Sequence, residues 1–298
     1  MDTTALDQAF PRLDGVTHRF VDLPGLRMHV AEAGQGHPIL LLHGFPQHWW
    51  EYRALIGPLA EHYRVICPDL RGCGWTEAPA DGYDADSLTG DVLHLLDALG
   101  VERVHIVAHD WGAIVAFRLA LLHPGRVTGL VSMGIPHPYV HVGARMVGRM
   151  RHGWYQFPLH TPGLGPRVVG GGRQRLMRYL LRRYSAVPGA ISEADLELFL
   201  SPLREPAHAR AGSEIYRRFI LPEGVRMLRG GYRDTRLTTP ALVLAGEHDP
   251  VIRVDVIGDA AGHADDLTVE EVPGASHFMV DDRPDFVAAR TLAFFAAR

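Results

Sequence analysis

The sequence contains no lysine, and all 30 of its basic residues are arginine. We attribute this absence to the base composition of the genome rather than to a function. Cysteine is scarce as well. Cys67 and Cys73 lie close together on either side of a turn-like segment, and two thiols do not make the disulfide framework of a secreted domain. We expect both thiols to be reduced.

Long apolar runs and a surplus of positive charge are also missing. No run reaches the roughly 20 apolar residues that span a bilayer, and no basic stretch followed by an apolar segment opens the chain. The net charge of −4 disfavours a general nucleic-acid binder, which needs an excess of basic residues. We therefore expect a cytoplasmic protein with no nucleic-acid or membrane partner. Composition leaves open whether it is a monomer or a homodimer.

Short apolar segments alternate with helical patterns along much of the chain, which is typical of an α/β fold with a mostly parallel sheet. The chain has 298 residues, of which 47% are hydrophobic and 21% are charged, so it can bury a full core. We predict strands over residues 17–22, 26–32, 39–42, 63–68, 104–108, 127–133, 241–245 and 267–272. Helices are predicted near residues 49–59, 87–99 and 112–122.

The alternation breaks between residues 137 and 232, which are rich in Arg, Gly and Pro and show amphipathic helical patterns but no clear strand. We predict a core domain of residues 1–136 and 233–298, with residues 137–232 forming a helical cap over the carboxyl ends of the strands, where ligands bind in open α/β sheets. The cap has 15 arginines against six acidic residues, a net charge of about +9. This charge either steers an anionic substrate or belongs to a solvated helical face.

A carboxylate occupies the turn between the predicted strand 104–108 and the following helix. The turn reads Ala-His-Asp-Trp-Gly-Ala over residues 108–113, and a strand-to-helix turn of this shape often carries a nucleophile. Such a turn tolerates only small residues beside the reactive one, and Ala108, Gly112 and Ala113 meet that requirement. Asp110 is thus the candidate nucleophile, able to attack carbon and form an ester that water must later cleave. The simpler alternative is an aspartate that caps a helix.

The segment His43–Pro46 follows the strand 39–42, so it lies at the same edge of the sheet as Asp110. We expect the backbone N–H groups of Phe45 and Trp111 to form an oxyanion hole. Pro46 allows a cis Phe45–Pro46 bond that would hold this loop. A plain Gly-Pro turn is the alternative.

Two further candidates follow the last two strands. Asp249 comes after strand 241–245, and His277 comes after strand 267–272. The order nucleophile, acid, histidine is that of α/β-hydrolases, in which the acid orients the imidazole and the imidazole activates water. Glu247 is the rival acid. His109, which has no obvious acid beside it, and His263 are expected to be structural.

Metal chemistry finds no support in the motifs. Although the chain has 18 histidines, it has no His-Glu-x-x-His motif and no Cys/His cluster with ligand spacing. We expect no metal and no other cofactor.

Taken together, these motifs make the chain resemble the epoxide hydrolase branch of the α/β-hydrolases along nearly its whole length. His43–Pro46 resembles the His-Gly-x-Pro loop of that family, and His109–Gly112 resembles its nucleophile segment. Members of the family hold the epoxide oxygen with two cap tyrosines. Tyr155 with Gln156 resembles the first tyrosine segment, and Tyr232 with Arg233 resembles the second.

The resemblance implies a small-molecule epoxide substrate. Asp110 would open the epoxide while Tyr155 and Tyr232 protonate the leaving oxygen, since an alkoxide is far more basic than a phenol with its pKa of about 10. Trp154 is expected to line the substrate pocket together with Phe45 and Trp111. Either Trp154 or Tyr139 could take the place of Tyr155 as the first cap aromatic residue.

Two groups of dehalogenases share the aspartate nucleophile and are the nearest alternatives. Haloalkane dehalogenases usually place Asn or Trp where Phe45 stands, and Phe has no side-chain donor for a halide. Haloacetate dehalogenases follow the nucleophile with arginines that grip a carboxylate, whereas this chain has Trp111 and Ile114 there. A non-catalytic receptor is a third alternative, but it would need no water-activating Asp249–His277 pair.

Overall fold

Eight strands form a single sheet in the order β1-β2-β4-β3-β5-β6-β7-β8. The computed structural model describes residues 10–141, 143–258, 260 and 262–297, so the first nine residues of the predicted core domain lie outside the described residues. Strand β2 pairs antiparallel with β1 and β4, and every other neighbouring pair is parallel. The strands are β1 (Thr17–Leu23), β2 (Leu26–Ala33), β3 (Pro38–Leu42), β4 (Arg64–Pro68), β5 (Val104–His109), β6 (Val127–Met133), β7 (Ala241–Gly246) and β8 (Leu267–Val272).

The predicted α/β class is confirmed, and each predicted strand is present with its ends within one residue. The central strands are apolar along their whole length because helices cover both faces of the sheet. In β3, for example, Leu40 and Leu42 face one core cluster while Ile39 and Leu41 face the other. The alternation follows from the two-residue period of a strand.

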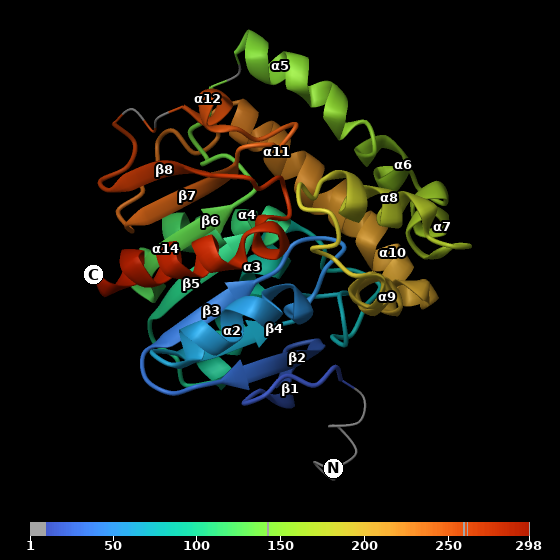
Figure 1. Ribbon diagram of the computed structural model, residues 1–298, viewed down its shortest axis with the longest axis horizontal. Helices are drawn as coiled ribbons and strands as arrows, with labels where there is room; N and C mark the ends of the chain where they lie inside the picture. Colours follow the sequence, from blue (N-terminus) through green and yellow to red (C-terminus); the bar gives the residue numbers. More distant parts are fainter. Residues whose placement is uncertain (1–9, 142, 259, 261, 298) are drawn as a thin grey trace.

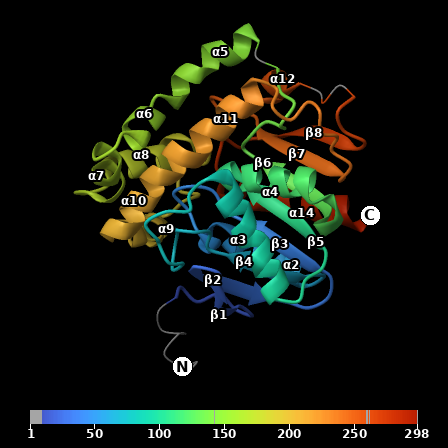
Figure 2. The same cartoon turned by 180° about the vertical axis from the view of Figure 1, so that it is seen from behind.

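Helices α3 (Ala85–Ala98) and α4 (Asp110–Leu122) cover one face of the sheet, and α2 (Arg53–Ala60) and α14 (Pro284–Ala296) cover the other (Figures 1 and 2). The predicted helix near residues 49–59 is divided into a 3-10 turn (Trp49–Tyr52) and α2. Helix α3 begins earlier than predicted because the side chain of Asp84 caps it by accepting hydrogen bonds from two backbone N–H groups. Two short helices, α12 (Val254–Ile257) and α13 (Met279–Asp282), follow β7 and β8.

Between β6 and β7 the described residues form helices and turns without a strand. We call these helices the cap helices, and we interpret them as the cap domain of residues 137–232. In both views they lie together at one end of the sheet (Figures 1 and 2). They are α5 (Ala144–Met150), α6 (Gln156–His160), α7 (Leu164–Gly170), α8 (Arg175–Arg183), α9 (Glu193–Leu200), α10 (Pro206–Ile215) and α11 (Leu221–Leu228), and a π-helical turn (Tyr216–Ile220) joins the last two.

The end of α8 is fastened to the loop that follows β8. The carbonyl of Tyr184 accepts hydrogen bonds from the backbone N–H groups of His277 (3.0 Å) and Phe278 (3.3 Å). The carboxylate of Asp282 accepts the backbone N–H groups of Ala186 (2.8 Å) and Val187 (3.0 Å). The cap helices and this loop of the core are therefore joined by backbone hydrogen bonds as well as by packing.

Cys67 and Cys73 are both free and buried, and they belong to different core clusters. Among the described residues, no helix has the length and apolar character that a membrane-spanning segment requires.

Candidate active site

The turn between β5 and α4 is as tight as the sequence predicts. Asp110 has a backbone φ of +49°, in the left-handed region that few non-glycine residues adopt. A Cβ added at Gly112 would lie 2.5 Å from the carbonyl oxygen of His43, and one added at Gly44 would lie 2.6 Å from the Cβ of Asp110. Larger residues at these two glycines would therefore displace the turn or its neighbouring loop, which explains why the sequence has glycine at both positions.

The two carboxylate oxygens of Asp110 have different surroundings. Its Oδ2 accepts a hydrogen bond of 3.0 Å from the backbone N–H of Phe45, and its Oδ1 lies 3.8 Å from Nε2 of His277. The Phe45–Pro46 bond is cis. One oxygen thus lies against the predicted oxyanion-hole donor, and the other faces the imidazole.

The imidazole of His277 is oriented from its other side by Asp249. Nδ1 of His277 lies 3.0 Å from Oδ2 of Asp249, which is buried. The second oxygen of Asp249 accepts the backbone N–H groups of Val251 (2.7 Å) and Ile252 (2.9 Å). These bonds hold the carboxylate in place, so that Nε2 of His277 is directed toward Asp110 and available to accept a proton.

The rival candidates occupy other positions. Glu247 accepts the backbone N–H of Gly274 at 2.9 Å, while Asp249 is the acid at the imidazole. The ring of His263 stacks on Tyr139 at a centroid distance of 5.0 Å.

The expectation that His109 has no acid beside it is wrong. Nδ1 of His109 lies 2.8 Å from Oε1 of Glu51 in a fully buried ion pair. The other oxygen of Glu51 accepts the backbone N–H of Gly44 at 2.9 Å, and Nε2 of His109 donates to the carbonyl of His277 at 2.9 Å. Burial lowers the pKa of His109, but the Glu51 carboxylate outweighs burial and raises that pKa to about 9. Glu51 therefore connects the Phe45 loop, the Asp110 turn and the His277 loop.

A chamber of about 20 Å³ lies above Asp110, enough room for about one water molecule. The core and the cap helices both line it, with Phe45, Asp110, His277 and Phe278 from the core and Tyr155, Leu180, Tyr184 and Tyr216 from the cap. Three of the lining residues are tyrosines, and the hydroxyl of Tyr184 donates to the carbonyl of His152. The phenols of Tyr155 and Tyr216 are the other two that the chamber brings near the predicted nucleophile.

The charge of Asp110 affects the pKa of both phenols. Burial and then the charge of Asp110 raise the pKa of Tyr155. Burial, the neighbouring Tyr155 and then Asp110 raise the pKa of Tyr216. The ring of Tyr216 packs edge-on against Phe45 at 5.5 Å between centroids. Both phenols are protonated at neutral pH, so each is a hydrogen-bond donor available to a ligand in the chamber.

Tyr232 does not reach this chamber, which corrects the sequence-based assignment of the second cap tyrosine. Its hydroxyl donates to the carboxylate of Glu223 and accepts a hydrogen bond of 3.0 Å from Arg118. Burial and the Glu223 carboxylate raise the pKa of Tyr232 to about 12. Because all three side chains are buried, the phenol of Tyr232 serves a structural hydrogen-bond network instead.

Three other aromatic residues also differ from expectation. Trp154 is 49% exposed and lies on the outside of the cap, near Tyr179, so it does not line the chamber. Tyr139 donates its hydroxyl to the carbonyl of Thr235 at 2.7 Å. Trp111 is fully buried against His43 and is not part of the chamber lining.

A second, larger cavity begins beside the chamber and has a volume of about 280 Å³. Its lining includes three residues close in sequence to those of the chamber. Gln156 directly follows Tyr155, Ile220 lies one helical turn after Tyr216, and Ile114 lies one turn after Asp110. Met150 of α5 and Val225 of α11 lie at its rim and are exposed. The cavity is mostly apolar, so it suits an apolar substituent.

Comparison with known proteins agrees with this geometry. Residues 37–284 match the family described as alpha/beta hydrolase fold. A soluble epoxide hydrolase from Corynebacterium sp. is 31% identical over 294 residues, covering 94% of this chain and 98% of the relative. Epoxide hydrolase A of Mycobacterium tuberculosis is 32% identical over 315 residues, covering 93% and 97%. The chain belongs to the epoxide hydrolase branch of the α/β-hydrolase fold family. An epoxide hydrolase structure from Vigna radiata superposes with a TM-score of 0.82 at 27% identity, covering 97% of this chain and 100% of that one.

In this hydrolase, Tyr216 is one of four chamber residues that the sequence did not predict, with Leu180, Tyr184 and Phe278. It begins the π-helical turn between α10 and α11, and Pro222 follows at the start of α11. Proline has no N–H to donate, which favours the wider turn at this point. A tyrosine on a helical stripe with Ile215 and Phe219 looks like a core residue in the sequence. The available signal was Pro222, which lies six residues after Tyr216 in the first turn of α11.

The described residues of this hydrolase contain no group of three or more His, Cys, Asp or Glu side chains arranged to hold a metal ion. The carboxylate of Asp110, the two phenols and the Asp249–His277 pair are suited to nucleophilic attack, proton donation and activation of water.

Proposed function

We propose that this hydrolase converts an epoxide into a vicinal diol through an ester on Asp110. The observation that carries the proposal is the placement of two protonated phenols, Tyr155 and Tyr216, in the same chamber as the carboxylate. A nucleophile alone would suit several substrates. Two donors beside it suit a leaving oxygen that stays attached to the product and must gain a proton.

In the first step, Oδ1 of Asp110 attacks an epoxide carbon and the carbon–oxygen bond of the ring breaks. Tyr155 and Tyr216 bind the departing oxygen and supply its proton, which gives a hydroxyalkyl ester. We assign the attack to Oδ1 because Oδ2 is held by the N–H of Phe45.

In the second step, His277 removes a proton from water, and the resulting hydroxide adds to the ester carbonyl. The negative charge then develops on Oδ2, where the N–H groups of Phe45 and Trp111 stabilise it. The intermediate collapses by breaking the bond between the carbonyl carbon and the substrate oxygen, which takes the proton of the added hydroxyl and leaves as the diol. Asp110 is then a carboxylate again, and the proton on His277 returns to the tyrosine that gave one up. The sum is epoxide plus water giving diol.

A dehalogenase reaction fits the chamber less well. Phe45 provides no side-chain donor to a departing halide, and the described residues that line the chamber include no arginine that could grip a carboxylate. Neither of the two dehalogenase reactions requires two phenols at the leaving group.

One experiment tests the class and the mechanism together. His277→Gln should form the ester but hydrolyse it slowly, so mass spectrometry after mixing with styrene oxide should find an adduct of epoxide mass on the peptide that contains Asp110. Asp110→Asn is the matched control, and it should gain no mass.

A single turnover of the wild-type enzyme in heavy-oxygen water completes the test. The diol from the first turnover should be unlabelled, because its new oxygen comes from Asp110, while the label enters the carboxylate. Labelled diol in the first turnover would refute the ester. Halide release from 1-bromobutane or chloroacetate, with no diol from any epoxide, would instead assign the chain to the dehalogenases.

A further inference from the structure

Four apolar side chains form an exposed stripe along α5 and α6 on the outside of the cap. Val147, Met150, Trp154 and Phe157 are 57%, 51%, 49% and 72% exposed. Their spacing of three, four and three residues places them on one side of a helical segment. Such a stripe normally faces a core. When it faces solvent instead, it marks a surface that contacts something apolar.

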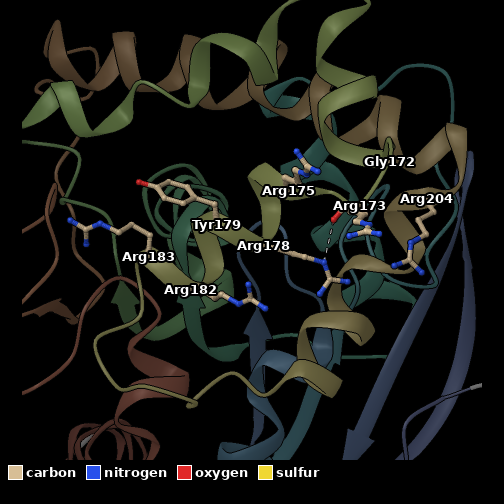
Figure 3. Close-up of a pocket in the computed structure, with 8 residues that line it drawn as sticks. All are labelled: Gly172, Arg173, Arg175, Arg178, Tyr179, Arg182, Arg183 and Arg204. Atoms are coloured by element: carbon tan, nitrogen blue, oxygen red, sulfur yellow. Dashed lines mark hydrogen bonds between the residues drawn. The ribbon is translucent and has the colours of Figure 1, made fainter.

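An arginine-rich cleft adjoins this stripe. The cleft has a volume of about 720 Å³ and is lined by Gly172, Arg173, Arg175, Arg178, Tyr179, Arg182, Arg183 and Arg204. Tyr179 joins the two surfaces, because its ring lies 6.4 Å from that of Trp154. Figure 3 shows the arginine side chains and Tyr179 of α8 and the loop before it, with Arg204 of the 3-10 turn Pro202–Arg204 at one end of the cleft.

The cleft keeps a positive charge after its ion pairs are considered. Arg178 pairs with Glu197 at 2.6 Å, and Arg182 pairs with Glu193. By contrast, no carboxylate within the described ranges lies at ion-pair distance from Arg173 or Arg175, and both are exposed. The whole cap segment has a net charge of about +9.

We propose that the outer face of the cap, from the α5–α6 stripe to the arginine cleft, docks on an anionic lipid surface. Exposed apolar and aromatic side chains next to arginines are the composition of a segment that lies in the interface of a membrane without crossing it. Tryptophan is favoured there because its ring is apolar and its N–H is polar. This docking needs no spanning helix, and it revises the expectation of no membrane partner.

The positive charge of this face favours an anionic lipid surface over a second copy of the chain. A symmetric dimer through this face would place two positively charged cleft regions against each other, which is unfavourable. An anionic surface gains from the same charge. Met150 belongs both to the stripe and to the rim of the 280 Å³ apolar cavity, so docking places the mouth of that cavity at the lipid. The proposal does not depend on which reaction the chamber performs.

Vesicle flotation tests the proposal directly. The full chain is mixed with vesicles of phosphatidylcholine, with or without phosphatidylglycerol, and the bound fraction is measured over a range of lipid and salt concentrations. We expect binding to the anionic vesicles that weakens as salt is raised, because exposed charges are screened. Binding to the neutral vesicles should be much weaker.

Two double variants divide the surface into its apolar and charged parts. Trp154→Ser with Phe157→Ser should weaken binding at least about tenfold. Arg173→Gln with Arg175→Gln should weaken it about 25-fold, since each arginine near an anionic surface contributes about fivefold.

Matched controls come from exposed residues of the core. Leu122 is 44% exposed on α4, and Arg12 and Arg103 are exposed arginines. Leu122→Ser, and Arg12→Gln with Arg103→Gln, should leave vesicle binding within about twofold of the wild type. Thermal unfolding of each variant shows that its fold is retained.

Several results would overturn the proposal. One is wild-type binding that is absent or equally strong on neutral vesicles. Another is a loss of binding in the core variants as large as in the cap variants. A third is a dimer, measured by light scattering, that Trp154→Ser with Phe157→Ser dissociates, because the stripe would then cover a second copy. If a variant fails to fold, the salt dependence of wild-type binding still tests whether the arginines contribute to docking.

Discussion

Replacing Tyr216 or Tyr232 by phenylalanine separates a phenol that contacts the reaction from one that holds the fold. Tyr216→Phe removes a donor to the leaving oxygen. The loss of one such donor costs about 2.7–4 kcal/mol of transition-state stabilisation, and with Tyr155 still present we expect ring opening to slow about 100-fold. The stability should change little, because phenylalanine keeps the ring that packs edge-on against Phe45.

Tyr232→Phe should do the opposite. It removes hydrogen bonds to the buried Glu223 and Arg118, and a hydrogen bond to a charged group contributes about 1.5–3 kcal/mol. For a chain of 298 residues a loss of about 2 kcal/mol lowers Tm by roughly 3–5 °C. The rate of ring opening should stay within about threefold of the wild type.

The assay is a single turnover of styrene oxide with enzyme in excess, quenched in acid and analysed for ester and diol, together with a thermal melt of each variant. If Tyr232→Phe slows ring opening about 100-fold while Tyr216→Phe does not, the assignment of the two tyrosines is wrong. Full activity in Tyr155→Phe combined with Tyr216→Phe would refute a role for both cap phenols.

Three other predictions follow from particular contacts. Because the folded pKa of His109 is about 9, the stability that the Glu51 ion pair provides, on the order of 3 kcal/mol, is fully present below pH 6.5 and lost as the pH rises through about 9. Urea melts should show this slope in the wild type but not in Glu51→Gln. Gly112→Ala should destabilise the chain by more than about 2 kcal/mol, measured by melting, since its Cβ would collide with the His43 carbonyl. Ile220→Trp should fill part of the 280 Å³ cavity and lower kcat/KM for 1,2-epoxyoctane at least about tenfold relative to propylene oxide; equal losses for both would show that the cavity does not hold the substituent.

Features with a strict local cause could be predicted from the sequence. The eight strands follow from short apolar runs, and the chain order places Asp110, Asp249 and His277 at the ends of parallel strands, which meet at one edge of the sheet. The turn at Asp110 follows from the small residues that its backbone requires, such as Gly112. In each case the physical constraint acts over a few residues.

The rest depends on distances between segments that are remote in the sequence. Tyr216 and Tyr232 are both aromatic residues late in the cap, and only the packing of α10, the π-helical turn and α11 decides which one reaches the chamber. Glu51 looks like a surface residue of a helix start until the fold buries it beside His109. Trp154 has the apolar character of a pocket residue, yet it lies in the turn that precedes α6 and its side chain is on the outside of the cap.

The hydrogen bonds from His277 and Phe278 to the carbonyl of Tyr184 connect access to the chamber with the timing of hydrolysis. The chamber has room for about one water molecule, so part of its lining must move to admit a substrate. A movement of α8 would either break these hydrogen bonds or displace the loop that carries His277. The position of this part of the cap and the position of the imidazole are thus linked through the backbone.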